Sequence, residues 1–114
     1  MRKEILFTMI AGLFMSLSVM AHGPKKVNLT FDKATKTLKA EITHKVKDVK
    51  KHYISDIIIY INGDEVKTSA YDKQSDKLEE VLEFILDDVQ TGDEIKLKAK
   101  CNKFGSKSSE ITVE

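Results

Sequence analysis

The stretch 53-YISDIIIYING-63 decides the fold. Residues 53–61 form a near-continuous apolar run, which is typical of a central β-strand buried on both faces. Asn62-Gly63 follows at once, and both positions tolerate the positive φ angles that a type I′ hairpin turn needs. We therefore expect a central strand at 53–61 that returns as an antiparallel strand at 64–71.

On both sides of this hairpin, apolar residues alternate with polar ones, which is the period of a half-buried strand. The apolar positions of these strands are Val27, Leu29 and Phe31; Leu38, Ala40 and Ile42; Leu82, Phe84 and Leu86; Ile95, Leu97, Ala99 and Cys101. Residues 91–93 read as a turn, and a last strand is expected at 108–113. About seven short antiparallel strands in about 93 residues predict an all-β, immunoglobulin-like β-sandwich.

Residues 1–21 differ in kind from the rest of the chain. A positively charged start precedes an apolar run, and small residues stand where a signal peptidase cleaves, after Ala21. We expect a secretory signal peptide at 1–21 and a mature domain at 22–114, exported to the periplasm or outside the cell. The alternative is an uncleaved membrane anchor, but the run is short against the about 20 residues that a span needs. No stable membrane span is expected after cleavage.

The charge and the cysteine usage narrow the classes of function. The chain has 19 basic and 18 acidic residues, and the expected signal peptide holds two of the former and one of the latter. The mature domain is therefore neutral, which argues against binding to nucleic acid. Cys101 is the one cysteine, so no internal disulfide can form, and a buried thiol, an intermolecular bridge or a metal ligand remain.

Strand alternation predicts that all three histidines and Cys101 lie at one end of the sandwich. His44 ends a strand, His52 begins the next, Cys101 ends a later one, and His22 precedes the first. Consecutive antiparallel strands reverse direction, so these positions share an end. The strand phase turns His44 and Cys101 inward. Imidazole and thiolate suit zinc, iron or copper. The alternative is a buried thiol beside a basic, solvated turn.

The order of these residues resembles the superoxide reductases, which are the iron domains of desulfoferrodoxin and neelaredoxin. The resemblance is carried by HGP at 22–24, HYI at 52–54 and CNKFG at 101–105. It implies a seven-stranded immunoglobulin-like fold with a ferrous centre, held by four equatorial histidines and an axial thiolate, that reduces superoxide to hydrogen peroxide. The metal ligands that it implies are His22, His44, His52 and Cys101.

The chain departs from the family pattern at several places, and the acidic and lysine residues that precede the family's first histidine are missing. Phe104 stands where the family has a further histidine ligand, and Phe has no donor atom. The interval between His44 and His52 is two residues longer than in the family, and Lys45 replaces a proline. We therefore expect an altered iron site.

Three functions follow as hypotheses. The first is a superoxide-reducing enzyme with iron as cofactor, in which Lys45 and Lys47, together with Lys50 and Lys51, draw the anion toward the metal. The second is a copper-binding or copper carrier protein, in which the new N-terminal amine and the imidazole of His22 chelate the ion. The third is a non-catalytic interaction module whose metal site has decayed.

Overall fold

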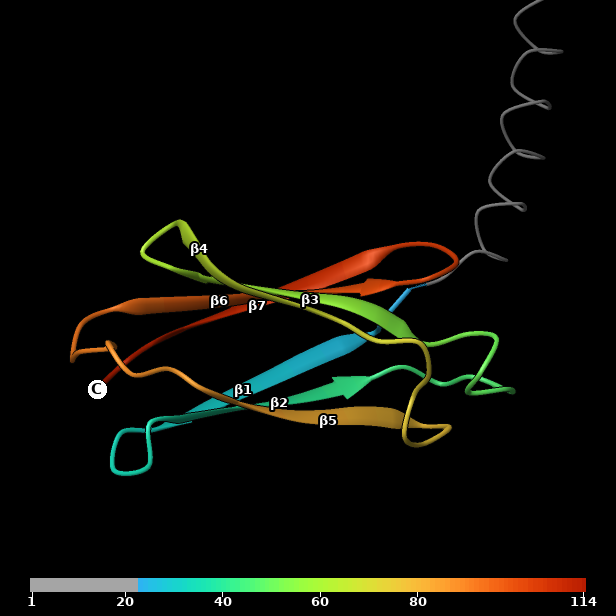
Figure 1. Ribbon diagram of the computed structural model, residues 1–114, viewed down its shortest axis with the longest axis horizontal. Coiled ribbons are helices and arrows are strands. Elements are labelled where there is room, and N and C mark those ends of the chain that lie inside the picture. Colours follow the sequence, from blue (N-terminus) through green and yellow to red (C-terminus); the bar gives the residue numbers. More distant parts are fainter. Residues whose placement is uncertain (1–22) are drawn as a thin grey trace, which may run out of the picture.

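A computed structural model describes residues 23–114 as two antiparallel β-sheets packed face to face (Figure 1). The strands are β1 (Lys26–Asp32), β2 (Thr37–Thr43), β3 (Ile54–Ile61), β4 (Asp64–Ala70), β5 (Glu79–Ile85), β6 (Glu94–Cys101) and β7 (Ser106–Thr112). One sheet has the order β1-β2-β5 and the other β4-β3-β6-β7. This confirms the prediction of an all-β, immunoglobulin-like sandwich. Unlike the constant-type immunoglobulin domain, the fourth strand pairs with the third.

The expected signal peptide at 1–21 lies outside the described residues, and so does His22. The boundary of the mature domain therefore stays a prediction. Within residues 23–114, no helix is long and apolar enough to cross a membrane.

The β3–β4 hairpin forms as the sequence predicts. Asn62 and Gly63 have φ angles of 51° and 90°, which the type I′ turn requires. β3 pairs with both β4 and β6, so it is central in its sheet. The prediction that β3 is buried on both faces is wrong. Ile57 and Ile59 point inward and are fully buried, whereas Ile58 on the outer face is half-buried, because among the described residues only the inner face packs against a second sheet.

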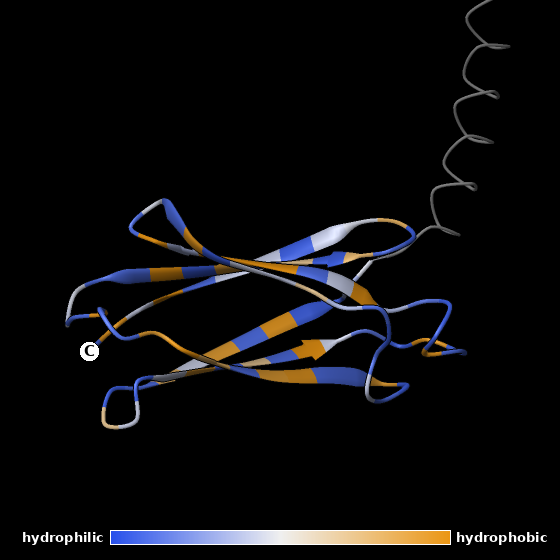
Figure 2. Cartoon of the chain, in the orientation of Figure 1, coloured by the Kyte–Doolittle hydropathy of each residue, from blue (hydrophilic) through white to orange (hydrophobic). Residues whose placement is uncertain are grey.

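The core lies between the two sheets and follows the alternation along each strand. Figure 2 shows the hydrophobic residues as separate bands that alternate with hydrophilic ones along the strands. The side chains with no exposed surface are Leu38, Ala40, Ile42, Ile54, Ile57, Ile59, Ile95, Leu97 and Ala99. Each large aliphatic side chain stabilises the fold by about 1.5–3 kcal/mol relative to exposure.

Three connections meet at one end of the sandwich, the right-hand end in Figure 1. They are residues 44–53 between β2 and β3, residues 71–78 between β4 and β5, and residues 102–105 between β6 and β7. We call this end the ligand rim. At the rim β3 has a bulge between Ile54 and Asp56, and Ile54 pairs with Cys101. Bulges are common beside functional sites, where they redirect side chains.

Candidate metal centre

His44, His52 and Cys101 form a compact group at the ligand rim. Their ligand atoms all lie within 4.8 Å of one another. His52 Nε2 is 3.1 Å from Cys101 Sγ, and the two imidazole rings lie 4.7 Å apart, nearly perpendicular at 88°. His44 is 1 % exposed and Cys101 8 %. The prediction that these three residues share one end and that His44 and Cys101 point inward is therefore confirmed, while their role as metal ligands stays a prediction.

His44 is fixed at the end of β2 by its backbone and its ring. Its N–H donates to Leu78 O at 3.0 Å, which continues the pairing of β2 one residue beyond the strand. Its Nδ1 lies 2.8 Å from Oε1 of Gln74. No pattern in the sequence singles out Gln74, because its side chain reaches the site from a different loop.

His52 is returned to the rim by a turn centred on Asp48. The Asp48 carbonyl accepts from Lys51 N at 3.1 Å and His52 N at 3.0 Å. The Asp48 carboxylate accepts from Lys50 N at 2.9 Å. Val46, 6 % exposed, anchors the start of the same loop. The long interval between the two histidines is thus an ordered loop that brings His52 within hydrogen-bonding distance of Cys101.

Cys101 stands at the entry to a tight turn. Its N–H donates to Gly105 O at 3.0 Å, and Gly105 has a φ of 85°, which favours glycine. Lys103 N–H lies 3.4 Å from Cys101 Sγ. The amide of Lys103 and the imidazole of His52 both face the Cys101 sulfur, and the thiol forms no disulfide. The sulfur is therefore held in one place and remains available to a metal.

Asn102 joins the His52 loop to the Cys101 turn. Its Nδ2 donates to Lys51 O at 3.0 Å, and its Oδ1 accepts from Tyr53 N at 2.9 Å. These partners flank His52 on both sides, and Asn102 itself follows Cys101. One carboxamide therefore sets the distance between two candidate ligands. The sequence showed Asn102 only as a letter of the CNKFG motif and gave it no role.

Phe104 and Gly23 meet at the same turn. Phe104 is 59 % exposed and contributes no donor atom to the group. A Cβ built on Gly23 would lie 2.8 Å from Gly105 C and 2.9 Å from Phe104 O. Only glycine permits this contact between the first described residue and the turn after Cys101. The first described residue thus lies against the turn that follows Cys101.

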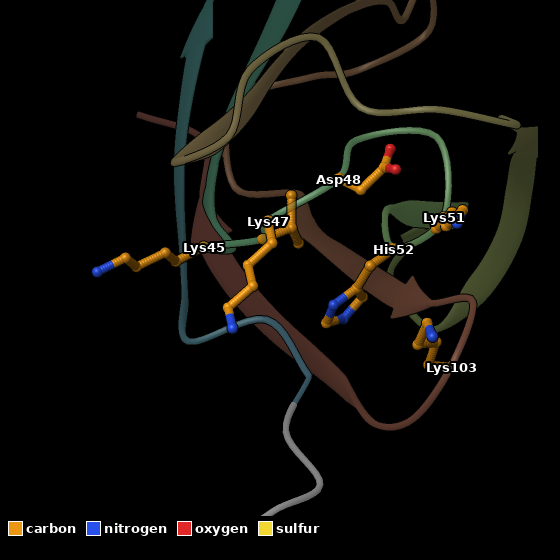
Figure 3. A pocket seen from close by; sticks show the side chains of 7 residues that line it. Lys45, Lys47, Asp48, Lys51, His52 and Lys103 are labelled. Carbon is orange, nitrogen blue, oxygen red and sulfur yellow. The ribbon is translucent and has the colours of Figure 1, made fainter.

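An open cavity of about 550 Å³ lies beside His52 (Figure 3). Its lining residues are Lys45, Val46, Lys47, Asp48, Lys51, His52 and Lys103. In Figure 3 the His52 ring lies between Lys47 and Lys103, and the Lys45 side chain extends away from it. Lys50 is exposed and does not line the cavity. The cavity is rich in positive charge, as the lysine-rich loop at 45–51 predicts. Lys103 comes from a different loop, and only the fold places it beside the other lysines.

Comparisons of the chain with family models, with curated proteins and with solved structures found no match. The function of the chain is therefore inferred from the geometry of the ligand rim and from the short motifs at 22–24, 52–54 and 101–105.

Proposed function

We propose that this protein is an exported metal protein of the superoxide reductase type, which binds iron and reduces superoxide to hydrogen peroxide. The observation that carries the proposal is the group of His44, His52 and Cys101, whose donor atoms lie within 4.8 Å of one another. A group of this composition, with His44 and Cys101 buried and His52 half-buried, and with ordered supporting loops, is an arrangement that metal sites in proteins use.

The donor set fits a borderline-soft transition metal. Two imidazole nitrogens and one thiolate are ligands for iron, zinc and copper. Phe104 offers no donor, so residues 23–114 do not supply the five ligands that the resemblance implies. In this proposal His22 supplies a fourth donor, since it precedes Gly23 directly and consecutive Cα atoms are about 3.8 Å apart. Gly23 itself packs against the turn that follows Cys101.

Superoxide takes up one electron and two protons to give hydrogen peroxide, and a ferrous ion would supply the electron. Hydrogen bonds hold the three candidate metal ligands in place. Asn102 links the segments of His52 and Cys101, and Gln74 fixes His44. Lys47 and Lys103 at the cavity raise the local concentration of an anion, because ammonium groups around a recess focus the electric field. The cavity is open to solvent beside His52.

A copper site is the second candidate, and the contact of Gly23 with residues 104–105 favours it. Cleavage after Ala21 would leave a free amine on His22, the residue before Gly23 in the chain. The amine and imidazole of His22 would then chelate copper, with His44 or His52 as a further ligand. Such a protein would carry metal and not reduce superoxide.

One experiment separates the candidates. The full chain is expressed in an exporting host, its N-terminus is determined by mass spectrometry, and its metal content is measured by elemental analysis after loading under reducing conditions. Iron with a thiolate charge-transfer band supports superoxide reduction. Copper that is lost when a residue is added before His22 supports the carrier. A protein that binds neither metal is a non-catalytic module, and both proposals then fail.

A further inference from the structure

The side chain of Gln74 joins the two sheets at the ligand rim. Gln74 lies between β4 and β5 and is 1 % exposed. Its Oε1 is 2.8 Å from His44 Nδ1 and accepts from Ile54 N at 3.2 Å. Its Nε2 donates to His44 O at 2.8 Å and to Asp76 O at 2.9 Å. All four sites of one buried carboxamide are thus occupied, by partners from both sheets and from its own loop.

The backbone partners determine which way the carboxamide faces. The carbonyl oxygens of His44 and Asp76 can only accept, so the NH₂ group of Gln74 must face them. The N–H of Ile54 can only donate, so the oxygen must face Ile54. His44 Nδ1 lies against that same oxygen, and an oxygen of this kind cannot donate. Nδ1 must therefore carry the proton, and the lone pair of a neutral His44 ring is on Nε2.

We propose that Gln74 is the positioning residue that makes His44 bind the metal through Nε2. This inference deepens the proposed metal site and rests on it for the identity of the ligand. Hydrogen bonds from a ligand's other ring nitrogen fix its tautomer and orientation in metal sites generally. Here the partner is a neutral amide, so it orients the ring without adding negative charge to the site.

The position of Gln74 is itself fixed by its loop. Gln74 N donates to Val49 O at 3.0 Å, in the loop that carries His52. The adjacent Ser75 hydroxyl and amide both donate to the carboxylate of Glu80, a residue that is 4 % exposed. Gln74 therefore contacts the segments that hold His44 and His52 at the same time. Because the bond to Val49 is made by the backbone of Gln74, a substitution retains it, and loss of the side chain should loosen His44 alone.

The test compares Gln74→Leu with Gln74→Glu. The leucine variant removes the acceptor from Nδ1, whereas the glutamate variant keeps an oxygen there and loses the amide donors. Each protein is purified from cells expressing the full chain. Histidine tautomers are read by ¹⁵N NMR in the metal-free protein, and affinity for Co²⁺ is measured by titration.

We expect the wild type and Gln74→Glu to hold the Nδ1–H tautomer of His44. Gln74→Leu should give a mixture of tautomers and bind Co²⁺ about 10–100-fold more weakly, the usual effect of removing such a partner. Ile42→Val, a conservative core change on β2, controls for general destabilisation and should leave the tautomer unchanged. If Gln74→Leu fails to fold, the wild-type spectrum still decides the matter, because a neutral His44 ring with its proton on Nε2 overturns the inference.

The two proposals fail in different ways. A protein that binds no metal but shows Nδ1–H on His44 in the wild type, and a tautomer mixture in Gln74→Leu, contradicts the proposed function and keeps the positioning role. A protein that binds Co²⁺ with equal affinity in the wild type and Gln74→Leu keeps the metal site and refutes the role of Gln74.

Discussion

His52 Nε2 lies 3.1 Å from Cys101 Sγ, although 49 positions separate the two residues in the chain. Two sets of hydrogen bonds create this contact. The Asp48 turn returns His52 to the rim, and the Asn102 carboxamide bonds the residues on either side of His52. An imidazole and a thiol held at this distance could share one metal ion.

Replacing Cys101 by serine should remove the thiolate ligand with little change in volume. We expect iron affinity to fall roughly tenfold or more and the thiolate charge-transfer band to vanish, because a neutral hydroxyl is a poor ligand for these ions. Elemental analysis and absorption spectra measure both effects. Copper bound through His22 should be unaffected by Cys101→Ser, so retained copper with lost iron would assign each ion to its own donors. Undiminished iron binding would show that Cys101 is not a ligand.

Asn102→Ala should weaken metal binding by about 10–100-fold, because His52 and Cys101 lose the side chain that sets their distance. Stability should fall by about 0.5–1.5 kcal/mol for each of the two hydrogen bonds to backbone groups that are lost. Asn62→Ala is the matched control. Asn62 also makes two side-chain hydrogen bonds, to Asp93 and Glu94, but at the opposite end of the sandwich.

Urea unfolding and Co²⁺ titration of both variants make the comparison. Asn62→Ala should lose stability and keep its metal affinity. Equal losses of affinity in the two variants would mean that general destabilisation, and not the position of Asn102, governs binding.

Gly23→Ala should disturb the turn after Cys101, because the new Cβ meets backbone atoms of residues 104–105 at less than 3.0 Å. Overpacking of this kind costs about 1–3 kcal/mol. We expect a lower unfolding midpoint and shifted NMR signals of Cys101 and Lys103. Gly63→Ala controls for the chemical change. Its Cβ would meet nothing within 4 Å, and it should cost about 1–2 kcal/mol through its φ of +90° alone, with no shift at Cys101.

The lysines at the cavity give the proposed reaction a dependence on salt. Lys47→Glu should slow the reaction of the iron protein with superoxide several-fold and weaken its dependence on ionic strength, because it reverses one charge beside His52. Pulse radiolysis measures the rate. Lys96→Glu serves as the control, since Lys96 lies over the Tyr60 ring on the outer face of the sheet, away from the cavity. A rate unchanged by Lys47→Glu at low salt would remove Lys47 from the steering role.

Asp93 makes stability depend on pH at the end opposite the ligand rim. Hydrogen bonds from Gln90 N and Asn62 Nδ2 hold the pKa of its carboxyl below the ordinary value of 3.8. The unfolded chain then binds the proton more readily, so this contribution is present above about pH 4 and is lost as the pH falls through the lowered pKa. Urea unfolding at pH 7, 5 and 3 should show a smaller loss at low pH in Asp93→Asn than in the wild type. An Asp72→Asn control accounts for the change in net charge, and identical pH profiles of Asp93→Asn and wild type would contradict the assignment.

The sequence by itself determined the strands, the hairpin and the end at which the candidate ligands meet. Alternating polarity has a period of two only in a strand, and antiparallel strands must reverse, so His44, His52 and Cys101 could be assigned to one rim from their positions alone. It overestimated the burial of the 53–61 strand, because an apolar run does not say how many sheets cover it.

Only the tertiary structure decided how that rim is built. Gln74 and Asn102 act through hydrogen bonds to backbone groups of other loops, and such bonds leave no periodic pattern in a sequence. Two further contacts also leave no pattern in the sequence. They are the close packing of Gly23 on residues 104–105 and the position of Lys103 beside His52. The donors follow from strand order, but their distances are set by loops whose conformation depends on long-range hydrogen bonds.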